Sequence, residues 1–564
     1  MEATNLSKIK RNEMIGFLDH LKEKNNDDKS IRAINEIINQ LNNTKYGLVW
    51  ERHQERVDVE LTNNIPIFTE VKEKQIFNDS NDYNFLLEGD NLHSLYLLEK
   101  THRGKIDLIY IDPPYNTGNK DFIYNDETLG KDDIFKHSKW LSFMEHRLRI
   151  ANNLLSKKGA IFISIDDNEL AQLKMLCDEI FEEKNFVGCI CRATGTTTGQ
   201  DANKIGSSLD YCLAYSKSQD FTLKGMPLNE KDLKRFKEED GKGKYSVLQL
   251  RKTGNEDRRE NRPNMFYSVI APDGTEVYPF GPSNYLSRWR VSQETYNELL
   301  EDDMIVWKKK TNFKKKFIDG FESSPWTPYV KYYAEGRTKQ VSNLFQDIEG
   351  NKKASLDLKN ILGKEIKFDY PKPVEFIKIL LKIASEPKST VLDFFAGSGT
   401  TGQAVLEANK DDGGNRKFIL CTNNENNICE EITYQRLKTV ITGKRKDDSA
   451  YSEGMKASLK YYITDWTPRM PQDYLLSNVL LLHIKEMIEL QNGIEIDNER
   501  NVIIFNKDDY NKYIVNEENF SKINRLWVNQ NIIFTGEEIQ KLNTKDFKYI
   551  PKEFFGQELK EAAE

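Results

Sequence analysis

The sequence has few of the features that mark membrane, secreted or metal-dependent proteins. No apolar run approaches the ~18 residues needed to span a bilayer, 30% of the 564 residues are charged, and the mean hydropathy is -0.68. The six cysteines are scattered, without a Cys-x-x-Cys pair or a nearby histidine, which disfavours a zinc site and favours reduced thiols. The first residues, Met1–Asn5, lack the charged-then-apolar plan of a signal peptide. These absences predict a cytoplasmic protein that binds no metal.

Positive charge is also not in excess over the whole chain. The 82 Lys and Arg residues are outnumbered by 89 Asp and Glu residues, which gives a net charge of -7. This balance argues against a protein that coats nucleic acid, although binding needs only a local basic surface. At about 150 residues per domain, the length predicts two to four domains.

A short apolar run ends in an unusual polar tetrapeptide. Residues 106–111 predict a buried strand, and Asp112-Pro113-Pro114-Tyr115 follows it directly. Open α/β sheets place their chemistry at the carboxyl ends of strands, so the tetrapeptide is a candidate site. A Pro-Pro turn that only caps the strand is the structural alternative.

Strands and helices alternate around this tetrapeptide. Before it, a strand ends near Gly89-Asp90 and a helix follows; Asp90 is also a candidate N-cap. After it come an amphipathic helix from Trp140 that Gly159 is predicted to close, a strand at 160–165 and another helix. The pattern returns with a helix at 374–384 and with strands at 391–395 and 417–421. This alternation predicts a doubly wound α/β fold with a parallel sheet.

The alternation is interrupted between about residues 195 and 350. Between Lys224 and Asp319 there are about 20 Lys or Arg residues against about 16 acidic residues, interleaved with aromatics. Such a mixture suits contacts to phosphates and bases, and a solvated charged insertion is the alternative. The candidate DNA-binding residues are Arg258, Arg259, Arg288, Arg290, Lys308, Lys309, Lys310 and Lys314.

A glycine-rich turn follows the strand at 391–395. Gly397, Gly399 and Gly402 have the Gly-x-Gly-x-x-Gly spacing that lets a cofactor approach the backbone. Alone, this spacing would indicate a nicotinamide-dependent oxidoreductase, with an acid at the end of the next strand. The next strand ends in Cys421-Thr422, and its only nearby acid, Glu425, is displaced. Such an enzyme would also have no use for the Asp-Pro-Pro-Tyr motif.

Together, the two motifs resemble those of DNA amino-methyltransferases that use S-adenosylmethionine. In that family the two motif strands lie side by side in one Rossmann-like sheet. Here the Asp-Pro-Pro-Tyr motif comes first, an order typical of the permuted beta group, mostly adenine-N6 enzymes with some cytosine-N4 ones. Over roughly residues 46–445 the chain resembles the Mod subunits of Type III restriction–modification systems. The stretches that carry this resemblance are Tyr46–Glu51, Glu88–Leu92, Asp112–Gly118, Phe162–Glu169, Asp369–Pro373 and Thr422–Arg436.

The resemblance implies a catalytic role for Asp112, Pro113, Pro114 and Tyr115. The Asp112 carboxylate and the Pro113 carbonyl would accept the two N–H bonds of an exocyclic amino group, and Tyr115 would stack on the base. The base must first leave the duplex, which costs a few kcal/mol. Because the sulfonium carries an activated methyl group, catalysis would need alignment and charge stabilisation but no metal.

The resemblance also implies the residues that bind S-adenosylmethionine. The methionine part would lie at Phe395, Gly397 and Gly399, and Lys372 would meet its carboxylate. Asp90 would accept a hydrogen bond from the adenine amino group of the cofactor. Related enzymes often hold the ribose with an acid where Thr422 stands here, so Asn423 or Glu425 is expected to take that role. The predicted set is Asp90, Asn91, Lys372, Asp393, Phe395, Gly397, Gly399, Thr400, Asn423 and Glu425.

The sequence predicts five consecutive parts of the chain. The predicted parts are a helical segment (1–45), a first methyltransferase half (46–194), a target-recognition domain (195–355), a second methyltransferase half (356–445) and a small C-terminal α/β domain (446–564). That last range contains an apolar helix at 475–490 and β-like runs at 502–505 and 531–534.

The predicted function is site-specific DNA adenine-N6 methylation by base flipping, as the modification subunit of a Type III system. The partners would be double-stranded DNA, a second copy of the chain and a separate restriction subunit, without a membrane. Cytosine-N4 methylation, a nicotinamide-dependent oxidoreductase and a DNA-binding subunit with an inactive site are the alternatives.

Overall fold

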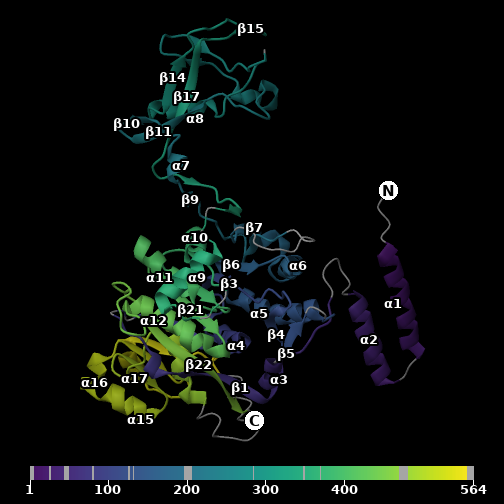
Figure 1. Ribbon diagram of the computed structural model, residues 1–564, viewed down its shortest axis with the longest axis vertical. Helices are drawn as coiled ribbons and strands as arrows, with labels where there is room; N and C mark the ends of the chain where they lie inside the picture. Colours follow the sequence, from purple (N-terminus) through teal and green to yellow (C-terminus); the bar gives the residue numbers. More distant parts are fainter. Residues whose placement is uncertain are drawn as a thin grey trace. The chain divides into compact units, whose positions relative to one another are not determined.

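The computed structural model describes residues 6–24, 27–42, 50–78, 80, 82–124, 127–130, 133–195, 206–283, 285–346, 348, 350–366, 368, 370–468 and 480–555. The chain divides into two compact units. Unit 1 comprises residues 1–223 and 342–564, and unit 2 comprises residues 224–341. Figure 1 labels the elements of both.

Unit 1 is built around a ten-stranded sheet. Six neighbouring strands run parallel, β22-β2-β21-β20-β3-β6, and the order of the whole sheet is β1-β22-β2-β21-β20-β3-β6-β8-β7-β19. The strands β1 and β8 are antiparallel to this central set. In chain order the strands are β1 (Asn64–Glu70), β2 (Tyr83–Glu88), β3 (Ile106–Ile111), β6 (Leu155–Ile165), β7 (Phe186–Ala193), β8 (Leu209–Ser216), β19 (Leu344–Phe345), β20 (Thr390–Asp393), β21 (Lys417–Thr422) and β22 (Ser458–Pro468).

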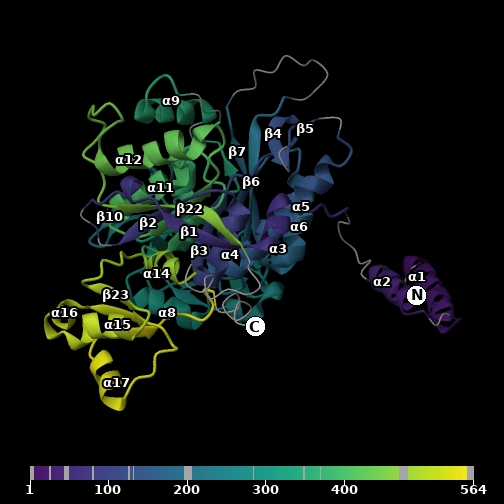
Figure 2. The same cartoon turned by 90° about the horizontal axis from the view of Figure 1, so that it is seen from below.

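Helices cover both faces of this sheet. The helices α9, α11 and α12 lie on one side and α3, α4 and α14 on the other, as Figure 2 shows. The larger helices of unit 1 are α1 (Leu6–Lys24), α2 (Asp28–Asn42), α3 (Arg56–Asn63), α4 (Asn91–His102), α5 (Lys136–Leu154), α6 (Leu170–Phe181), α9 (Asn351–Leu362), α10 (Val374–Ala384), α11 (Thr400–Asp412), α12 (Gln435–Thr442) and α14 (Ile484–Asn492).

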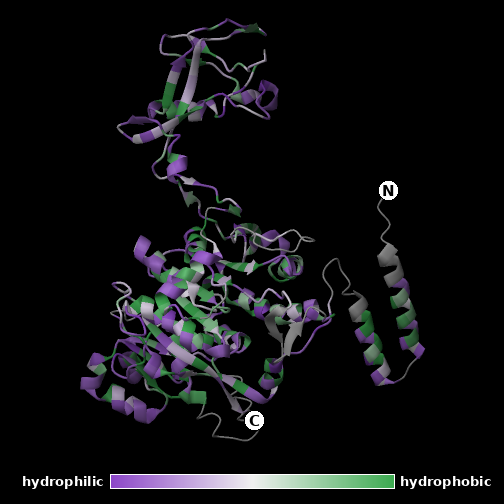
Figure 3. Cartoon of the chain, in the orientation of Figure 1, coloured by the Kyte–Doolittle hydropathy of each residue, from purple (hydrophilic) through white to green (hydrophobic). Residues whose placement is uncertain are grey.

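The central strands are apolar because both faces are covered. In β3, five of the six residues are buried, and the strands at the centre of unit 1 are largely apolar in Figure 3. The predicted doubly wound α/β fold is therefore confirmed, with a sheet wider than the sequence pattern indicated.

Three local predictions are wrong. Gly159 does not close a helix, because α5 ends at Leu154 and β6 already begins at Leu155. Residues 531–534 form no strand. The range 446–564 is not separate from the main sheet, since β22 pairs with both β1 and β2 inside it.

The remainder of unit 1 consists of smaller elements. A short parallel sheet near the C-terminal end has its own apolar cluster, which includes Val502, Leu526 and Leu542. The smaller elements are β4 (Asn119–Tyr124), β5 (Glu127–Gly130), β23 (Asn501–Ile504), α15 (Lys507–Tyr510), α16 (Glu517–Lys522), β24 (Arg525–Val528), α17 (Gly536–Leu542) and β25 (Asp546–Tyr549). The stretch 43–49 and the first part of the predicted helix at 475–490 lie outside the described residues.

Unit 2 has a core of its own around a four-stranded antiparallel sheet of order β10-β11-β17-β14. Trp289, Val330 and Leu250 are among the buried residues of this core. Its elements are β9 (Met226–Pro227), α7 (Glu230–Leu233), β10 (Glu238–Asp240), β11 (Gly243–Gln249), β12 (Val269–Ile270), β13 (Glu276–Val277), α8 (Gln293–Glu301), β14 (Ile305–Lys309), β15 (Phe317–Ile318), β16 (Phe321–Glu322), β17 (Trp326–Tyr333) and β18 (Thr338–Lys339).

Candidate active site

The two sequence motifs begin side by side at one edge of the sheet. Strands β3 and β20 are parallel neighbours, with Leu108 opposite Val391 and Ile109 opposite Leu392. Asp112 follows β3 and Asp393 ends β20, so both carboxyl groups lie at the carboxyl ends of adjacent strands. This is the position at which open α/β sheets bind ligands.

Asp112, Tyr115 and Lys372 form a closed triangle of polar contacts. The Tyr115 hydroxyl donates to Asp112 Oδ1 at 2.9 Å, and Lys372 Nζ donates to the same hydroxyl at 2.7 Å. Lys372 Nζ also lies 2.9 Å from Asp112 Oδ1. Burial and the neighbouring Asp112 carboxylate raise the pKa of Tyr115 well above its ordinary value, so the hydroxyl stays protonated as a donor.

The backbone that carries these side chains is braced by buried partners. The indole of Trp140, on α5, donates to the Pro114 carbonyl at 2.7 Å. Asn116 has a left-handed φ of 57°, and its amide donates to Glu169 Oε1 at 2.6 Å. His137 Nδ1 lies 2.6 Å from the same oxygen. Burial raises the pKa of Glu169 to about 8, and its Oε2 has no hydrogen-bond partner among the described residues.

The glycine loop after β20 is fixed from inside. Buried Asp393 accepts from the Phe395 amide at 3.0 Å and from the Thr401 hydroxyl at 2.5 Å. Burial raises the pKa of Asp393 to about 7. Gly397 and Gly399 have φ of 48° and 75°, which glycine adopts without strain.

A buried arginine supports the same loop from α12. Arg436 is 1% exposed and donates to the Ser398 carbonyl at 3.2 Å, to the Thr400 hydroxyl at 2.8 Å and to Gln403 Oε1 at 2.8 Å. Burial lowers the pKa of Arg436 to about 10. The Thr400 hydroxyl is therefore engaged with Arg436 and Ser398.

Asp90 and Asn91 form the neighbouring corner, between β2 and α4. Asp90 caps α4 by accepting from the Leu92 amide at 2.8 Å, while 44% of its side chain remains exposed. Asn91 donates to the Phe394 carbonyl at 2.8 Å, which links it to the glycine loop. Buried Arg147 donates to Asn91 Oδ1 at 2.6 Å and to Glu55 Oε1 at 2.7 Å. The structure thus brings Asp90, Asn91 and Phe395 to one corner.

A family model with the description DNA methylase matches residues 106–435, which is more than half of the chain. The chain belongs to the DNA methylase family. The predicted family resemblance is thereby confirmed, and the oxidoreductase alternative loses its support.

Relatives of this DNA methylase include modification enzymes of two types. It is 35% identical to the Type II methyltransferase M.KpnI of Klebsiella pneumoniae, over 62% of this chain and 82% of that one. It is 30% identical to the Type III EcoPI Mod subunit of Escherichia phage P1, over 74% of this chain and 71% of that one. The StyLTI Mod subunit of Salmonella typhimurium is also 30% identical, over 70% of this chain, but the alignment spans only 62% of that relative.

The remaining predicted cofactor residues lie after β21 and before α10. Asn423 and Glu425 follow β21 and are exposed, whereas Thr422 is 7% exposed and its carbonyl accepts from the Gly89 amide at 3.0 Å. Lys372, predicted at the methionine carboxylate, contacts Asp112 and Tyr115.

Five residues that support the site were not identified from the sequence. Asp210 lies 3.8 Å from Lys372 and forms an ion pair with Arg192 at 2.6 Å. The other three are Glu169, Arg147 and Arg436, and of the five only Glu169 and Arg436 fall inside a stretch that carries the family resemblance.

The predicted DNA-binding residues of unit 2 divide by exposure. Arg288 is 6% exposed, and its guanidinium donates to the Glu256 carbonyl at 2.6 Å, so it supports the core. Arg290 likewise donates to the Gln249 carbonyl at 2.9 Å. Arg259 is half-buried beside Phe266. The exposed residues of the predicted set are Arg258, Lys308, Lys309, Lys310 and Lys314.

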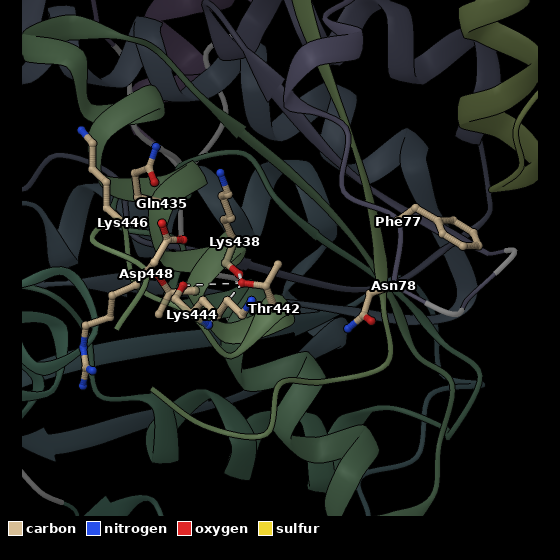
Figure 4. Close-up of a pocket in the computed structure, with 10 residues that line it drawn as sticks. Phe77, Asn78, Gln435, Lys438, Thr442, Lys444, Lys446 and Asp448 are labelled. Atoms are coloured by element: carbon tan, nitrogen blue, oxygen red, sulfur yellow. Dashed lines mark hydrogen bonds between the residues drawn. The ribbon is translucent and has the colours of Figure 1, made fainter. Parts of the chain in front are cut away.

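A hollow of about 470 Å³ lies elsewhere in unit 1, at the C-terminal end of α12 (Figure 4). Lys438, Lys444, Arg445, Lys446 and Asp448 contribute to its lining. Phe77 and Asn78, which also line it, precede the start of β2, so the hollow lies toward the amino ends of the parallel strands. It is therefore distinct from the edge that carries Asp112 and Asp393.

The described part of the chain contains neither a cluster of metal ligands nor a helix that could span a membrane. Among those residues, no group of three or more His, Cys, Asp or Glu side chains could hold a metal ion. No helix among them is long and apolar enough to cross a membrane.

Proposed function

We propose that this DNA methylase transfers the methyl group of S-adenosylmethionine to N6 of an adenine that has left the duplex. The observation that supports this most is the adjacency of the Asp112–Tyr115 segment and the Gly397–Gly399 loop at the ends of β3 and β20. One segment can hold an amino group, and the other lets a cofactor approach the backbone. Transfer between two bound molecules requires this proximity.

The residues at the loop fit S-adenosylmethionine. Gly397 and Gly399 keep the backbone accessible, and the half-exposed Asp90 carboxylate can accept from an amino group. When bound, the cofactor would supply a methyl group on a sulfonium, whose sulfur leaves as a neutral thioether when the bond to the methyl group breaks. Asp393 holds the turn through its two hydrogen bonds.

The chain's own contribution is to orient the acceptor nitrogen. Asp112 Oδ2 and the Pro113 carbonyl accept the two N–H bonds, so the nitrogen becomes tetrahedral and its lone pair points at the methyl group. Tyr115 stacks on the base, which flips out of the duplex. The Asp112 carboxylate also stabilises the positive charge that develops on the nitrogen.

The test is transfer of a tritiated methyl group from S-adenosylmethionine to unmodified DNA, followed by nucleoside analysis by mass spectrometry. We expect N6-methyladenine, and Asp112→Ala should lower the rate about 100-fold or more because one acceptor of the amino group is lost. Normal methylation by Asp112→Ala would refute the mechanism. N4-methylcytosine as the product would establish the runner-up function, because the same two acceptors suit either amino group.

The Mod relatives support a further proposal, that the chain is the modification subunit of a Type III system in the cytoplasm. It would act as a homodimer and pair with a separate restriction subunit. Single-molecule sequencing of DNA from cells that express the chain tests this. Methylation of one strand at an asymmetric site is expected, whereas a palindromic site marked on both strands would weaken the Type III assignment.

Unit 2 is proposed as the domain that recognises the target sequence. It supplies exposed Lys308, Lys309, Lys310 and Lys314 for phosphates, and polar side chains for base edges in the major groove. Its four-stranded sheet with a separate core would present these side chains from a rigid support.

A further inference from the structure

Lys372 lies in a segment whose backbone has little freedom. It stands between Pro371 and Pro373, and Pro373 is the N-cap residue of α10. Both prolines fix φ and restrict the residue that precedes each of them. Tyr370 has a left-handed φ of 57°. Helix α10 is buried along one face, so the segment is anchored to the core.

The Lys372 side chain is almost fully enclosed, and its ammonium lies among polar groups of the site. It is 7% exposed, donates to the Tyr115 hydroxyl at 2.7 Å and forms an ion pair with Asp112 Oδ1 at 2.9 Å. Asp210 Oδ2 lies 3.8 Å from it. The positive charge of Lys372 therefore lies between two carboxylates, and its ammonium also donates to the Tyr115 hydroxyl.

The charges around Lys372 are balanced. Asp210 is paired with the buried Arg192 at 2.6 Å, and Arg192 in turn donates to Asn351 Oδ1 at 2.9 Å. Two carboxylates and two cations therefore alternate from Asp112 to Arg192. A buried cation that lost one of these partners would be destabilised, which argues that Lys372 is held in this place.

We propose that Lys372 positions the Asp112 carboxylate and the Tyr115 hydroxyl for methyl transfer, and does not bind the carboxylate of the cofactor. This inference rests on the proposed function of the site. Asp112 Oδ1 accepts from the Tyr115 hydroxyl and forms the ion pair with the Lys372 ammonium. The carboxylate is thereby fixed with Oδ2 toward the target amino group.

Loss of the contact between Lys372 and Asp112 would impair alignment of the target nitrogen more than cofactor binding. Without the ammonium, Asp112 could turn about its side-chain bonds, and it would face Asp210 without an intervening positive charge. The target nitrogen would then be misaligned with the methyl group, although the cofactor would still bind. A displacement of about 1 Å can cost roughly 100-fold in rate.

The experiment compares Lys372→Gln, Lys372→Arg and the control Lys382→Gln, an exposed lysine of α10, the helix that follows Lys372. Methyl transfer is measured in single turnovers with saturating DNA and S-adenosylmethionine, and cofactor affinity is measured by calorimetry. Lys372→Gln should lower the single-turnover rate roughly 100-fold with a cofactor Kd within about threefold of wild type. Lys372→Arg should recover part of the rate, and Lys382→Gln should match wild type.

A double variant identifies the route of the effect. Lys372→Gln combined with Tyr115→Phe should be little slower than the slower single variant, because both changes disrupt the same triangle. If the double variant instead lost rate by the product of the two single fold-losses, Lys372 would act independently of Tyr115, and the proposal would be overturned. Far-ultraviolet circular dichroism and the melting temperature of each variant exclude loss of fold as the cause.

Two results on Lys372→Gln alone would also overturn the positioning role of Lys372. A cofactor Kd raised tenfold or more, with the rate restored at saturation, would assign Lys372 to the cofactor carboxylate. An unchanged rate and Kd would show that the contact is dispensable. If wild-type protein itself transfers no methyl group to DNA, the proposed function fails, which is a different outcome.

Discussion

Glu169 places a buried, proton-binding carboxyl directly beside the catalytic segment. It joins Asn116, just after Tyr115, to His137 at the start of α5. Its pKa is raised to about 8 by burial, so the folded chain holds a proton that the unfolded chain has released above about pH 4.5. Because the unfolded state binds fewer protons in this window, the free energy of unfolding contributed by Glu169 falls as the pH rises toward 8.

The neutral variant Glu169→Gln should remove this dependence. The stability of wild type relative to the variant should fall by roughly 1–3 kcal/mol between pH 5.5 and 7.5. Urea unfolding at several pH values measures it. The exposed Glu239→Gln serves as a control and should follow wild type. A constant difference between wild type and Glu169→Gln over this range would contradict the assigned protonation.

Among the secondary-structure elements, β22 gives Gly89 a role that the local sequence does not reveal. The sequence predicts that Gly89 ends a strand, and its φ of 137° agrees with a turn that needs glycine. The structure adds a second reason. A Cβ at Gly89 would lie 1.7 Å from Thr464 Oγ1, on a strand whose position no local pattern indicates.

Gly89→Ala should therefore destabilise the chain by about 2–4 kcal/mol, from overpacking and from the positive φ together. Thr464→Ala in the same chain should recover only part of this loss, because the backbone strain remains. Thermal or urea unfolding of the two variants measures both effects. Full recovery by Thr464→Ala would show that the contact alone is responsible, and no recovery would show that the strain dominates.

The elements that the sequence predicted are those whose signals are local. The helix at 374–384 begins and ends as predicted, and β3 and β20 follow from continuous apolar runs. Strands β1 and β22 were missed because their pairing joins residues 64–70 to 458–468, almost 400 positions apart. The contact between Lys372 and Asp112 was missed for the same reason, since 260 positions separate them.

In the whole molecule, charge is distributed unevenly between the two units. Residues 224–341 contain 23 Lys or Arg residues and 18 acidic ones, although the chain as a whole has a net charge of -7. A DNA methylase with an acidic net charge needs a local basic surface to approach DNA. Composition predicted this excess, but it could not separate exposed cations from those, such as Arg288, that hold the core.

Exposed and buried cations of unit 2 should therefore behave differently when they are neutralised. Lys310→Gln and Lys314→Gln should each weaken DNA binding and reduce the slope of log K against log salt by about 1, because one phosphate contact is lost. Fluorescence anisotropy of the full chain with duplex DNA between 50 and 300 mM salt measures the slope. Arg288→Gln should instead lower the melting temperature, since the Glu256 carbonyl loses its donor. An unchanged slope in both lysine variants would show that these lysines of unit 2 do not contact DNA phosphates. The basic hollow of unit 1, lined by Lys438, Lys444 and Lys446, would then be the next surface to neutralise.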